Sequence, residues 1–319
     1  MKFANESIEI NVKNKPRIEV TDFSKGILKE SFRCRDPFIM PYGGKYYLYK
    51  NAVEKGIECL VSEDLTNWSE PIMVFETPKD FHGCGSWFWA PECHYYKGYF
   101  YIFTSVKSAK YDGRRTISVY RADNPLGPFE DIADGAISPT DWDAIDGTLY
   151  IDKQGAPWMV FVHEWTSMPD KNGGMVAARL SEDFTRFISE PITLFYAKDP
   201  DWATDGITDG PFLYRTEKDT LYMIWSNFSA KGYAIGLAKS SNGEIDGNWS
   251  QEGLLYQKDM RKEFVFDGGH GMIFKRNDGV NCLALHCPNG KTAQGDFEHL
   301  NIFTIVEKND KLEIENKVR

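Results

Sequence analysis

Three aspartates, Asp36, Asp146 and Asp209, each stand directly before a proline or glycine at the start of a short apolar run. Asp-Gly and Asp-Pro are ordinary turn pairs, so each aspartate taken alone is more readily explained as a turn residue. Carboxylates that gather in one site act differently, because burial and like charge shift their pKa values and make proton transfer available near neutral pH. Their role therefore depends on whether the chain brings them together.

The chain repeats itself with a period of about 60 residues. A Ser/Ala-acid element followed by an aromatic residue occurs in VSEDLTNW from Val61, YRADNPLG from Tyr120 and LSEDFTRF from Leu180, and in weaker form in KSSNGEID from Lys239. The second residues of these copies are 62, 121, 181 and 240, which are 59, 60 and 59 positions apart. So regular a period is typical of repeat architectures.

Two strand-like segments precede each copy of this element. The second of them is rich in aromatic residues: KYYLYKN, GYFYIFTS, APWMVFVHE, TLYMIWSNF and, near the C-terminus, NCLALHCPN. The first segment begins with a short motif that contains proline or glycine: RDPFIMPY at 35, APECHYY at 90, DGTLYID at 146, DGPFLYR at 209 and DGGHGMIF at 267. Five units of roughly four antiparallel strands predict an all-β, five-bladed β-propeller, and the regular spacing disfavours an ordinary β-sandwich. We expect one domain over residues 1–319, with blades starting near 35, 90, 146, 209 and 267.

The first strand of a propeller blade lines the central channel, so its opening residue faces the channel mouth. The opening residues are Asp36, Ala90, Asp146, Asp209, and Asp267 or His270. The second strand returns to the same mouth and ends at Asn51, Ser105, Glu164, Ser226 and His286. Glu92, two positions after Ala90, is expected to point to the same side. At least four carboxylates and two histidines are therefore predicted to share one mouth.

Carboxylates in this arrangement suit glycoside hydrolysis. One acid protonates the leaving oxygen, and a second carboxylate activates water from a distance of roughly 6.5–9.5 Å in inverting enzymes. A third acid raises the pKa of the donor through like-charge repulsion. Flat aromatic side chains can stack on the sugar rings. The candidates for stacking are Trp87, Phe88 and Trp89, ahead of one first strand, and Trp142, Trp165 and Trp202 in or near predicted mouth loops.

The composition excludes some classes of partner. The formal net charge is −10, from 47 acidic and 37 basic side chains, which argues against nucleic acid and fits a neutral or cationic ligand. No run of 18 or more apolar residues occurs, so neither a membrane span nor a membrane partner is predicted.

The predicted location follows from the N-terminus and the cysteines. The stretch MKFANESIEI lacks the apolar region of a signal peptide. The six cysteines form no CxxC pair, and we expect mostly free buried thiols. These features predict a cytoplasmic protein, or a periplasmic or secreted one whose signal peptide has been removed.

These motifs resemble glycoside hydrolase family 43, five-bladed propeller enzymes that act on arabinofuranosides and xylosides, over about residues 33 to 305. The resemblance implies inversion without an organic cofactor. It implies that Asp36, in the RDP at 35–37, is the general base, and that Asp146, in the IDG at 145–147, modulates the pKa of the acid. WAP at 89–91 is also similar to a family signature. GGHG at 268–271 resembles the motif whose histidine lies in the channel, often near Ca²⁺, which implies a metal role for His270.

One position departs from the family pattern. The family usually has Glu-Gly-Pro in the fourth blade, with that Glu as the general acid, whereas this chain has Asp209-Gly210-Pro211. The spacing of 63 residues from Asp146 fits, but the side chain is one methylene shorter. Either Asp209 is the acid in an adjusted site, or Glu164 donates the proton, or the site is weak or altered in substrate.

The predicted function is therefore an inverting glycosidase for α-L-arabinofuranosides or β-D-xylosides of plant cell-wall polysaccharides or their oligosaccharides. The predicted substrate-binding residues are Arg35, Trp87, Phe88, Trp89, Glu92, Trp165 and His286. The alternatives are a non-catalytic carbohydrate-binding propeller and a glycosidase for galactosides or fructosides. The fructan-hydrolase family has an RDP and a Glu-Cys motif, which are present here at 35–37 and 92–93. Its Asn-Asp-Pro motif, which carries the nucleophile, is missing before Arg35, and this disfavours the fructan-hydrolase alternative.

Overall fold

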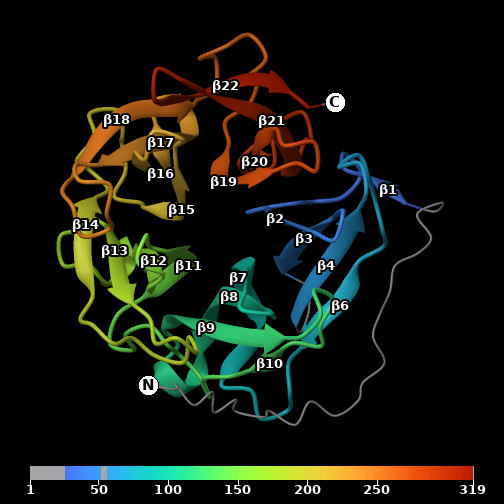
Figure 1. Ribbon diagram of the computed structural model, residues 1–319, viewed down its shortest axis with the longest axis vertical. Coiled ribbons are helices and arrows are strands. Elements are labelled where there is room, and N and C mark those ends of the chain that lie inside the picture. Colours follow the sequence, from blue (N-terminus) through green and yellow to red (C-terminus); the bar gives the residue numbers. More distant parts are fainter. Residues whose placement is uncertain (1–25, 52–55, 319) are drawn as a thin grey trace, which may run out of the picture.

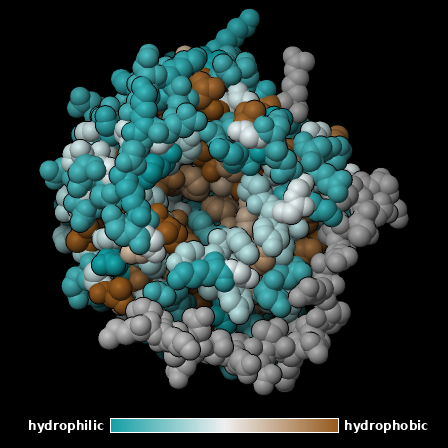
Figure 2. All heavy atoms as spheres, viewed as in Figure 1, coloured by the Kyte–Doolittle hydropathy of each residue, from teal (hydrophilic) through white to brown (hydrophobic). Residues whose placement is uncertain are grey.

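The computed structural model describes residues 26–51 and 56–318. Five antiparallel sheets surround a central axis as the blades of a propeller, which confirms the predicted all-β fold (Figure 1). The face seen in Figure 2 is hollowed at the centre of this ring. Among the described residues, no helix has the length and apolar character needed to cross a membrane.

The strands follow chain order from blade to blade. The first sheet contains β1 (Ile27–Leu28), β2 (Phe38–Tyr42), β3 (Lys45–Asn51), β4 (Gly56–Ser62), β5 (Asn67–Trp68) and β6 (Ile72–Glu76). The second contains β7 (Gly83–Tyr96), β8 (Tyr99–Ser108), β9 (Arg115–Ala122) and β10 (Glu130–Asp131). The third contains β11 (Ala144–Ile151), β12 (Pro157–His163), β13 (Gly174–Arg179) and β14 (Ile192–Tyr196). The fourth contains β15 (Asp209–Arg215), β16 (Leu221–Ser229), β17 (Gly232–Ser240) and β18 (Trp249–Tyr256). The fifth contains β19 (Gly269–Lys275), β20 (Asn281–Cys287), β21 (His299–Lys308) and β22 (Lys311–Lys317). Two 3₁₀ turns, η1 (Ala109–Tyr111) and η2 (Trp165–Ser167), complete the described elements.

The sequence of each strand matches its place in the blade. The innermost strands β2, β7, β11, β15 and β19 contact one another around the axis. The second strand β16, LYMIWSNFS, is apolar along most of its length and is buried on both faces. The outer strand β22, KLEIENK, alternates and buries only Leu312 and Ile314. Core side chains gather between neighbouring blades, as Phe75, Phe88 and Tyr120 do between the first and second.

Tight turns set the register of three hairpins. The two-residue turns Gly43–Gly44, Lys97–Gly98 and Asn309–Asp310 have positive φ at both positions. Turns of this kind match the right-handed twist of the flanking strands, and glycine or asparagine adopts them at low cost.

A kink with positive φ recurs at the mouth end of all five inner strands. It falls on Asp36, Ala90, Asp146, Gly210 and His270, with φ between 47° and 55°. In the four later blades the ladder to the second strand shifts by one residue at this kink, as in a β-bulge. The residue before each bulge is paired: Trp89 with Ser105, Ile145 with Val162, Asp209 with Ser226, and Gly269 with His286.

This register corrects two of the predicted equivalences and decides between the two candidates in the fifth blade. Asp209 lies one residue before the kink, whereas Asp36 and Asp146 lie on it. In the fifth blade the kink residue is His270; Asp267 instead accepts hydrogen bonds from the amides of Tyr233, in β17, and Asn289. Glu164 lies just beyond the end of β12, where it caps the 3₁₀ turn η2.

Several kink residues also join their blade to the preceding one through the backbone amide. The amide of Asp146 donates to Ser105 Oγ (2.9 Å) and that of His270 donates to Ser226 Oγ (2.8 Å). In both cases the acceptor belongs to the second strand of the preceding blade. Val162 occupies that place in the third blade and has no acceptor, so the amide of Gly210 donates to Asp146 Oδ2 instead (3.0 Å). The carboxylate of Asp146 thus accepts the hydrogen bond between blades that a serine hydroxyl accepts in the other two cases.

The ring closes without exchange of strands, since the described first and fifth sheets each come from one end of the chain. Side-chain and loop contacts join them: Lys29 Nζ donates to the carbonyl of Val318 (3.1 Å), and the amide of Cys34 donates to the carbonyl of Glu298 (2.9 Å). All five cysteines whose side chains are described are buried free thiols, as predicted.

Candidate active site

A cavity of about 440 Å³ lies at the mouth, where the kinks of the inner strands meet. Eight residues predicted for the site line it: Arg35, Asp36, Trp89, Asp146, Glu164, Trp165, Asp209 and His270. They come from the first to the fifth blade, so the sequence repeat does bring the three aspartates together.

Asp36 is held in its charged form. Burial alone would raise its pKa, but His270, His286 and Arg35 outweigh burial and keep the pKa well below its usual range. His270 Nδ1 lies 3.3 Å and His286 Nδ1 3.2 Å from Asp36 Oδ1. His286 Nδ1 also lies 3.2 Å from the Asp36 amide, so the neutral ring accepts this N–H, whereas the protonated ring donates to the carboxylate. Asp36 is therefore charged near neutral pH, as a general base has to be.

Asp146 is 4 % exposed and has the opposite tendency. Burial, and then the charge of Asp36, raise its pKa to about 7, although the Gly210 amide donates to it. His270 Nδ1 lies 3.8 Å from Asp146 Oδ2 and so stands between the two carboxylates. This proximity fits the predicted role of Asp146 as the group that adjusts its neighbours.

Asp209 has no cation in ion-pair contact among the described residues. Its Oδ2 accepts a hydrogen bond of 2.9 Å from the hydroxyl of Tyr233, which is 1 % exposed. Burial, and then the charge of Asp146, raise the pKa of Asp209 to about 7 against the opposing effects of His270 and Tyr233. Near neutral pH, Asp209 is therefore able to carry and release a proton.

Glu164 also has a raised pKa, of about 7, mainly through burial. Arg115 opposes this shift: its Nε lies 2.8 Å from Glu164 Oε2 in an ion pair. Arg115 is fixed in turn by Thr166 Oγ1, at 3.0 Å from its Nη2, and by Asp143, whose Oδ1 accepts the Arg115 amide at 2.9 Å. Asp146, Glu164 and Asp209, the three acids with raised pKa values, interact, so the loss of a proton from one of them affects the pKa of the others.

Arg35 links Asp36 to the fifth blade. Its Nε lies 3.6 Å from Asp36 Oδ2, and its Nη1 donates to Glu298 Oε1 at 3.3 Å. Arg33 holds the same glutamate through two hydrogen bonds of 2.9 and 3.0 Å. Arg35 thus helps to keep Asp36 charged and also pairs the first blade with the fifth.

The predicted aromatic residues separate into two groups. Trp89 and the half-exposed Trp165 line the cavity. Trp87 lies in an adjoining groove and packs against Trp89, with ring centroids 4.7 Å apart and ring planes tilted by 44°. Phe88 is fully buried against Phe75 and Phe81, so its prediction as a sugar-binding residue is wrong. Trp142 packs against Phe161 and His163, and Trp202 packs against Trp225, which removes both from the stacking set.

Two further predicted substrate contacts also lie behind the cavity wall. His286 is fully buried and acts on Asp36, while its Nε2 pairs with Asn289 Oδ1 at 3.2 Å. Glu92 is 5 % exposed and pairs with His94 at 3.1 Å. Neither residue lines the cavity, which corrects the prediction that they contact the substrate directly.

Arg115 and Tyr233 line the cavity but were missing from the predicted site. Both stand at the start of a third strand, β9 and β17. Third strands run antiparallel to second strands and therefore begin at the mouth. The first residues of the third strands should have been counted among the mouth residues, which would have included Arg115 and Tyr233.

The donor set does not fit a metal bound directly by protein atoms. In the described part of the chain no three His, Cys, Asp or Glu side chains converge in a way that could hold a metal ion. Ca²⁺ requires six to eight oxygen ligands, and His270 turns its Nδ1 to Asp36 and Asp146. The axial Ca²⁺ held through water stays a prediction, and no step below depends on it.

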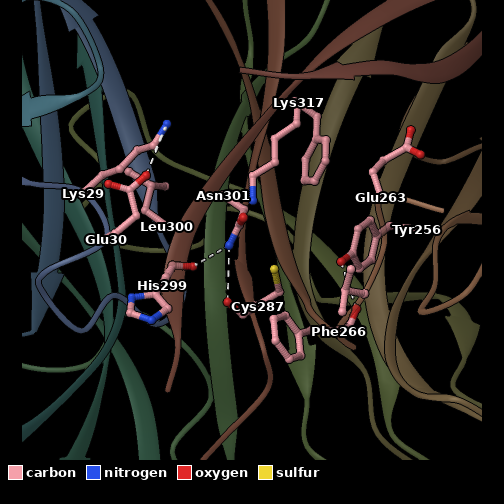
Figure 3. A pocket seen from close by; sticks show the side chains of 12 residues that line it. Lys29, Glu30, Tyr256, Glu263, Phe266, Cys287, His299, Leu300, Asn301 and Lys317 are labelled. Carbon is pink, nitrogen blue, oxygen red and sulfur yellow. Dashed lines mark hydrogen bonds and ion pairs between the residues drawn. The ribbon is translucent and has the colours of Figure 1, made fainter. Parts of the chain in front are cut away.

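A second, smaller pocket of about 200 Å³ lies elsewhere, between Lys29–Glu30 and the outer part of the fourth and fifth blades (Figure 3). Asn301 crosses its centre and donates to the carbonyls of Cys287 and His299. It contains no cluster of acids with raised pKa values, so it lacks the chemistry of the mouth.

Comparison with known proteins agrees with the geometry. The model of the glycosyl hydrolases family 43 matches residues 30–308. The structure of an endo-arabinase from Bacteroides thetaiotaomicron VPI-5482 superposes with a TM-score of 0.79 and 36 % identity, over 90 % of this chain and 99 % of that one. An endo-1,4-β-xylanase from the same source gives a TM-score of 0.76 and 25 % identity, over 91 % and 97 %.

Two curated relatives match over shorter stretches. An extracellular endo-α-(1→5)-L-arabinanase of Bacillus subtilis (strain 168) is 28 % identical over 42 % of this chain, and an extracellular exo-α-(1→5)-L-arabinofuranosidase of Cellvibrio japonicus (strain Ueda107) is 30 % identical over 47 %. Each match covers 44 % of the relative, so less than half of its length is spanned. Since the family model extends over most of the sequence, the chain belongs to the glycosyl hydrolases family 43.

Proposed function

We propose that the protein is an inverting glycoside hydrolase in which Asp36 activates water and Asp209 protonates the leaving oxygen. The observation that supports this proposal is that two carboxyl groups of one cavity have very different pKa values. Asp36 keeps a pKa well below its usual range, whereas the pKa of Asp209 is raised to about 7. Over the pH range between these two values, the base is charged while the acid keeps its proton, as general acid–base catalysis requires.

Asp209 is preferred over Glu164 as the proton donor because of their different partners. Arg115 lies against Glu164 and stabilises its charged form, which opposes the protonation that a proton donor needs. Asp209 is instead contacted by the neutral hydroxyl of Tyr233. It also faces the charge of Asp146, and this charge favours the protonated form of Asp209. In this proposal Glu164 orients Arg115 at the edge of the cavity, and Asp146 keeps the pKa of Asp209 high.

The proposed substrates are α-L-arabinofuranosides, in arabinan or its oligosaccharides, with β-D-xylosides second. The endo-arabinase structure at 36 % identity and the two relatives named for α-(1→5)-L-arabinan linkages support the first class. The xylanase structure at 25 % identity supports the second. Trp89 and Trp165 supply aromatic surface for the sugar rings. The names of both curated relatives place them outside the cell, which favours the second predicted location, outside the cytoplasm.

The test is a hydrolysis assay on aryl α-L-arabinofuranoside, aryl β-D-xyloside and arabino- and xylo-oligosaccharides, with NMR of the first-formed anomer. Asp36→Asn is expected to lose activity on every substrate. Asp209→Asn is expected to lose roughly 10²–10⁴-fold on oligosaccharides, the usual contribution of a general acid, but little on aryl glycosides with good leaving groups. Glu164→Gln provides the comparison, and Asp259→Asn, at an exposed ion pair, is the control.

The outcomes separate the alternatives. Selective recovery of Glu164→Gln on good leaving groups would transfer the role of acid to Glu164. Retained anomeric configuration would contradict inversion. Sugar binding without turnover on any substrate would favour a carbohydrate-binding propeller instead.

A further inference from the structure

A second groove of about 440 Å³ adjoins the catalytic cavity on the second blade. Arg115 lines both spaces, and Trp87, in the groove, packs against Trp89, in the cavity. The groove continues over the end of β8, which carries Lys107, and over the loop between β8 and β9, which carries Arg114. A glycan whose cleaved unit lies among the catalytic carboxylates can therefore extend a neighbouring unit into this groove.

The groove carries more positive than negative charge. Its charged residues are Lys107, Arg114 and Arg115 against Asp112 and Asp143. This excess is local, because the whole chain has a net charge of −10. Asp143 is already engaged, since its Oδ1 accepts the Arg115 amide at 2.9 Å and its Oδ2 accepts the hydroxyl of Thr166 at 3.0 Å. Its Oδ2 lies 3.6 Å from Arg115 Nη2 and 3.8 Å from Arg114 Nη1, so Asp143 offsets part of the positive charge, and an excess of one cation among the lining residues remains.

Lys107 is placed to meet an anion. Its Nζ lies 4.9 Å from the centroid of the Trp87 ring, a cation–π contact that positions the ammonium without neutralising it. Among the described residues Lys107 has no ion-pair partner. Arg114 is 40 % exposed in its side chain, and its Nη1 is 3.8 Å from Asp143 Oδ2, a loose contact that leaves donors free. Two cations with unused donors thus border a tryptophan beside the catalytic cavity.

We propose that this groove is a subsite for a carboxylate-bearing sugar, a hexuronate unit next to the cleaved glycosidic bond. The proposal rests on the hydrolase function argued above and specifies its substrate class. The uronate carboxylate would bind Lys107 and Arg114, and the sugar ring would lie along Trp87. Neutral glycans would still be cleaved, but glycans that carry an acidic unit would bind more tightly.

The experiment measures binding and hydrolysis side by side. The probes are xylotetraose with and without one glucuronosyl branch, and an α-1,4-linked galacturonate trimer as the second source of hexuronate. Binding is measured by calorimetry on the Asp36→Asn protein, so that no turnover is needed. Lys107→Ala, Arg114→Ala and the double variant are compared with Lys97→Ala. Lys97 is a matched control, because its ammonium also lies over an aromatic ring, that of Tyr96, at 5.1 Å, but in the β7–β8 turn.

The parent is expected to bind the glucuronosyl probe more tightly than the neutral one. Since exposed charge pairs contribute little, each substitution should weaken binding of acidic probes by roughly two- to fivefold, and the double variant by roughly tenfold. Binding of neutral xylotetraose and the behaviour of Lys97→Ala should not change. The preference should also shrink in 0.5 M salt, where charges are screened within roughly 4 Å.

Equal binding of acidic and neutral probes by the parent would overturn the subsite, and so would a preference that survives the double substitution. If neutral oligosaccharides are hydrolysed without any acidic preference, the hydrolase function stands and the subsite fails. If acidic probes bind selectively and no substrate is hydrolysed, the subsite stands and the hydrolase function fails. Selective binding of only one hexuronate source would identify the acidic sugar.

Discussion

The hydrogen bond from Tyr233 to Asp209 sets the upper pH limit of the proposed reaction. The hydroxyl donates to Oδ2 at 2.9 Å, and both side chains belong to the fourth blade. A donated hydrogen bond favours the charged carboxylate, so it lowers the pKa that burial and Asp146 raise. Tyr233→Phe removes the hydroxyl and keeps the ring, which stacks near His286.

The size of the effect follows from the two protonation states. Hydrogen bonds to charged groups contribute about 1.5–3 kcal/mol and neutral ones about 0.5–1.5 kcal/mol, so the charged form of Asp209 loses about 1 kcal/mol more. One pKa unit corresponds to about 1.4 kcal/mol, so the pKa of Asp209 should rise from about 7 by roughly 0.7 to 1 unit. Because the acid must be protonated, activity is lost as pH rises through this pKa, and the loss should move to higher pH.

The assay is kcat/KM against pH, from pH 4 to 10, on an oligosaccharide whose leaving group needs protonation. The alkaline limb of Tyr233→Phe should lie roughly one unit above that of the parent. Tyr256→Phe is the control, because Tyr256 is equally buried in the same blade and donates to the carbonyl of Phe266, away from the carboxylates. An unchanged limb, or one moved to lower pH, would refute Asp209 as the group that limits activity at high pH.

Three further predictions concern the contacts around the cavity. His286→Asn removes a ring whose hydrogen bond and charge lower the pKa of Asp36, so this pKa should rise. Because the base must be ionised, activity at about pH 4 should fall relative to the parent, and an unchanged acid limb would contradict the argument. Ser226→Ala deprives the buried His270 amide of its acceptor and should lower the free energy of unfolding by about 1–3 kcal/mol in urea titrations; a loss near zero would show that this bond between blades is unimportant. Gly210→Ala would place a Cβ 2.8 Å from the His270 ring at φ +51°, so it should lower stability by at least about 1 kcal/mol in the same titration, and an unchanged midpoint would count against the strain.

The fold was predictable because its signals are local and repeated. The Ser/Ala-acid element at Val61, Tyr120 and Leu180 returns at nearly constant spacing, and the turns that it marks join antiparallel strands. The residues before a proline or glycine at each blade start were also correct markers of the mouth, because the kinks occur there.

Side-chain direction was less predictable. The bulge is the same in the third and fourth blades, yet Asp146 lies on the kink and Asp209 precedes it. Only Pro211, which follows the kink as Pro37 and Pro91 do, marks this offset in the sequence. Phe88 lies between two tryptophans that reach the mouth, yet the alternation of a strand turns it into the core. The partners of Asp36 come from the far end of the chain, and pairing of His286 with Asp36 depends on ring closure.

The base and its supports come from opposite ends of the chain. Asp36 belongs to the first blade, whereas His270, His286 and the glutamate that anchors Arg35 belong to the fifth or to its loops. In the proposed reaction, Asp36 could therefore activate water only after the fifth blade has been synthesised and has packed against the first. Chains that lack the fifth blade are expected to be inactive, so turnover would also report the fraction of molecules in which these two blades have met.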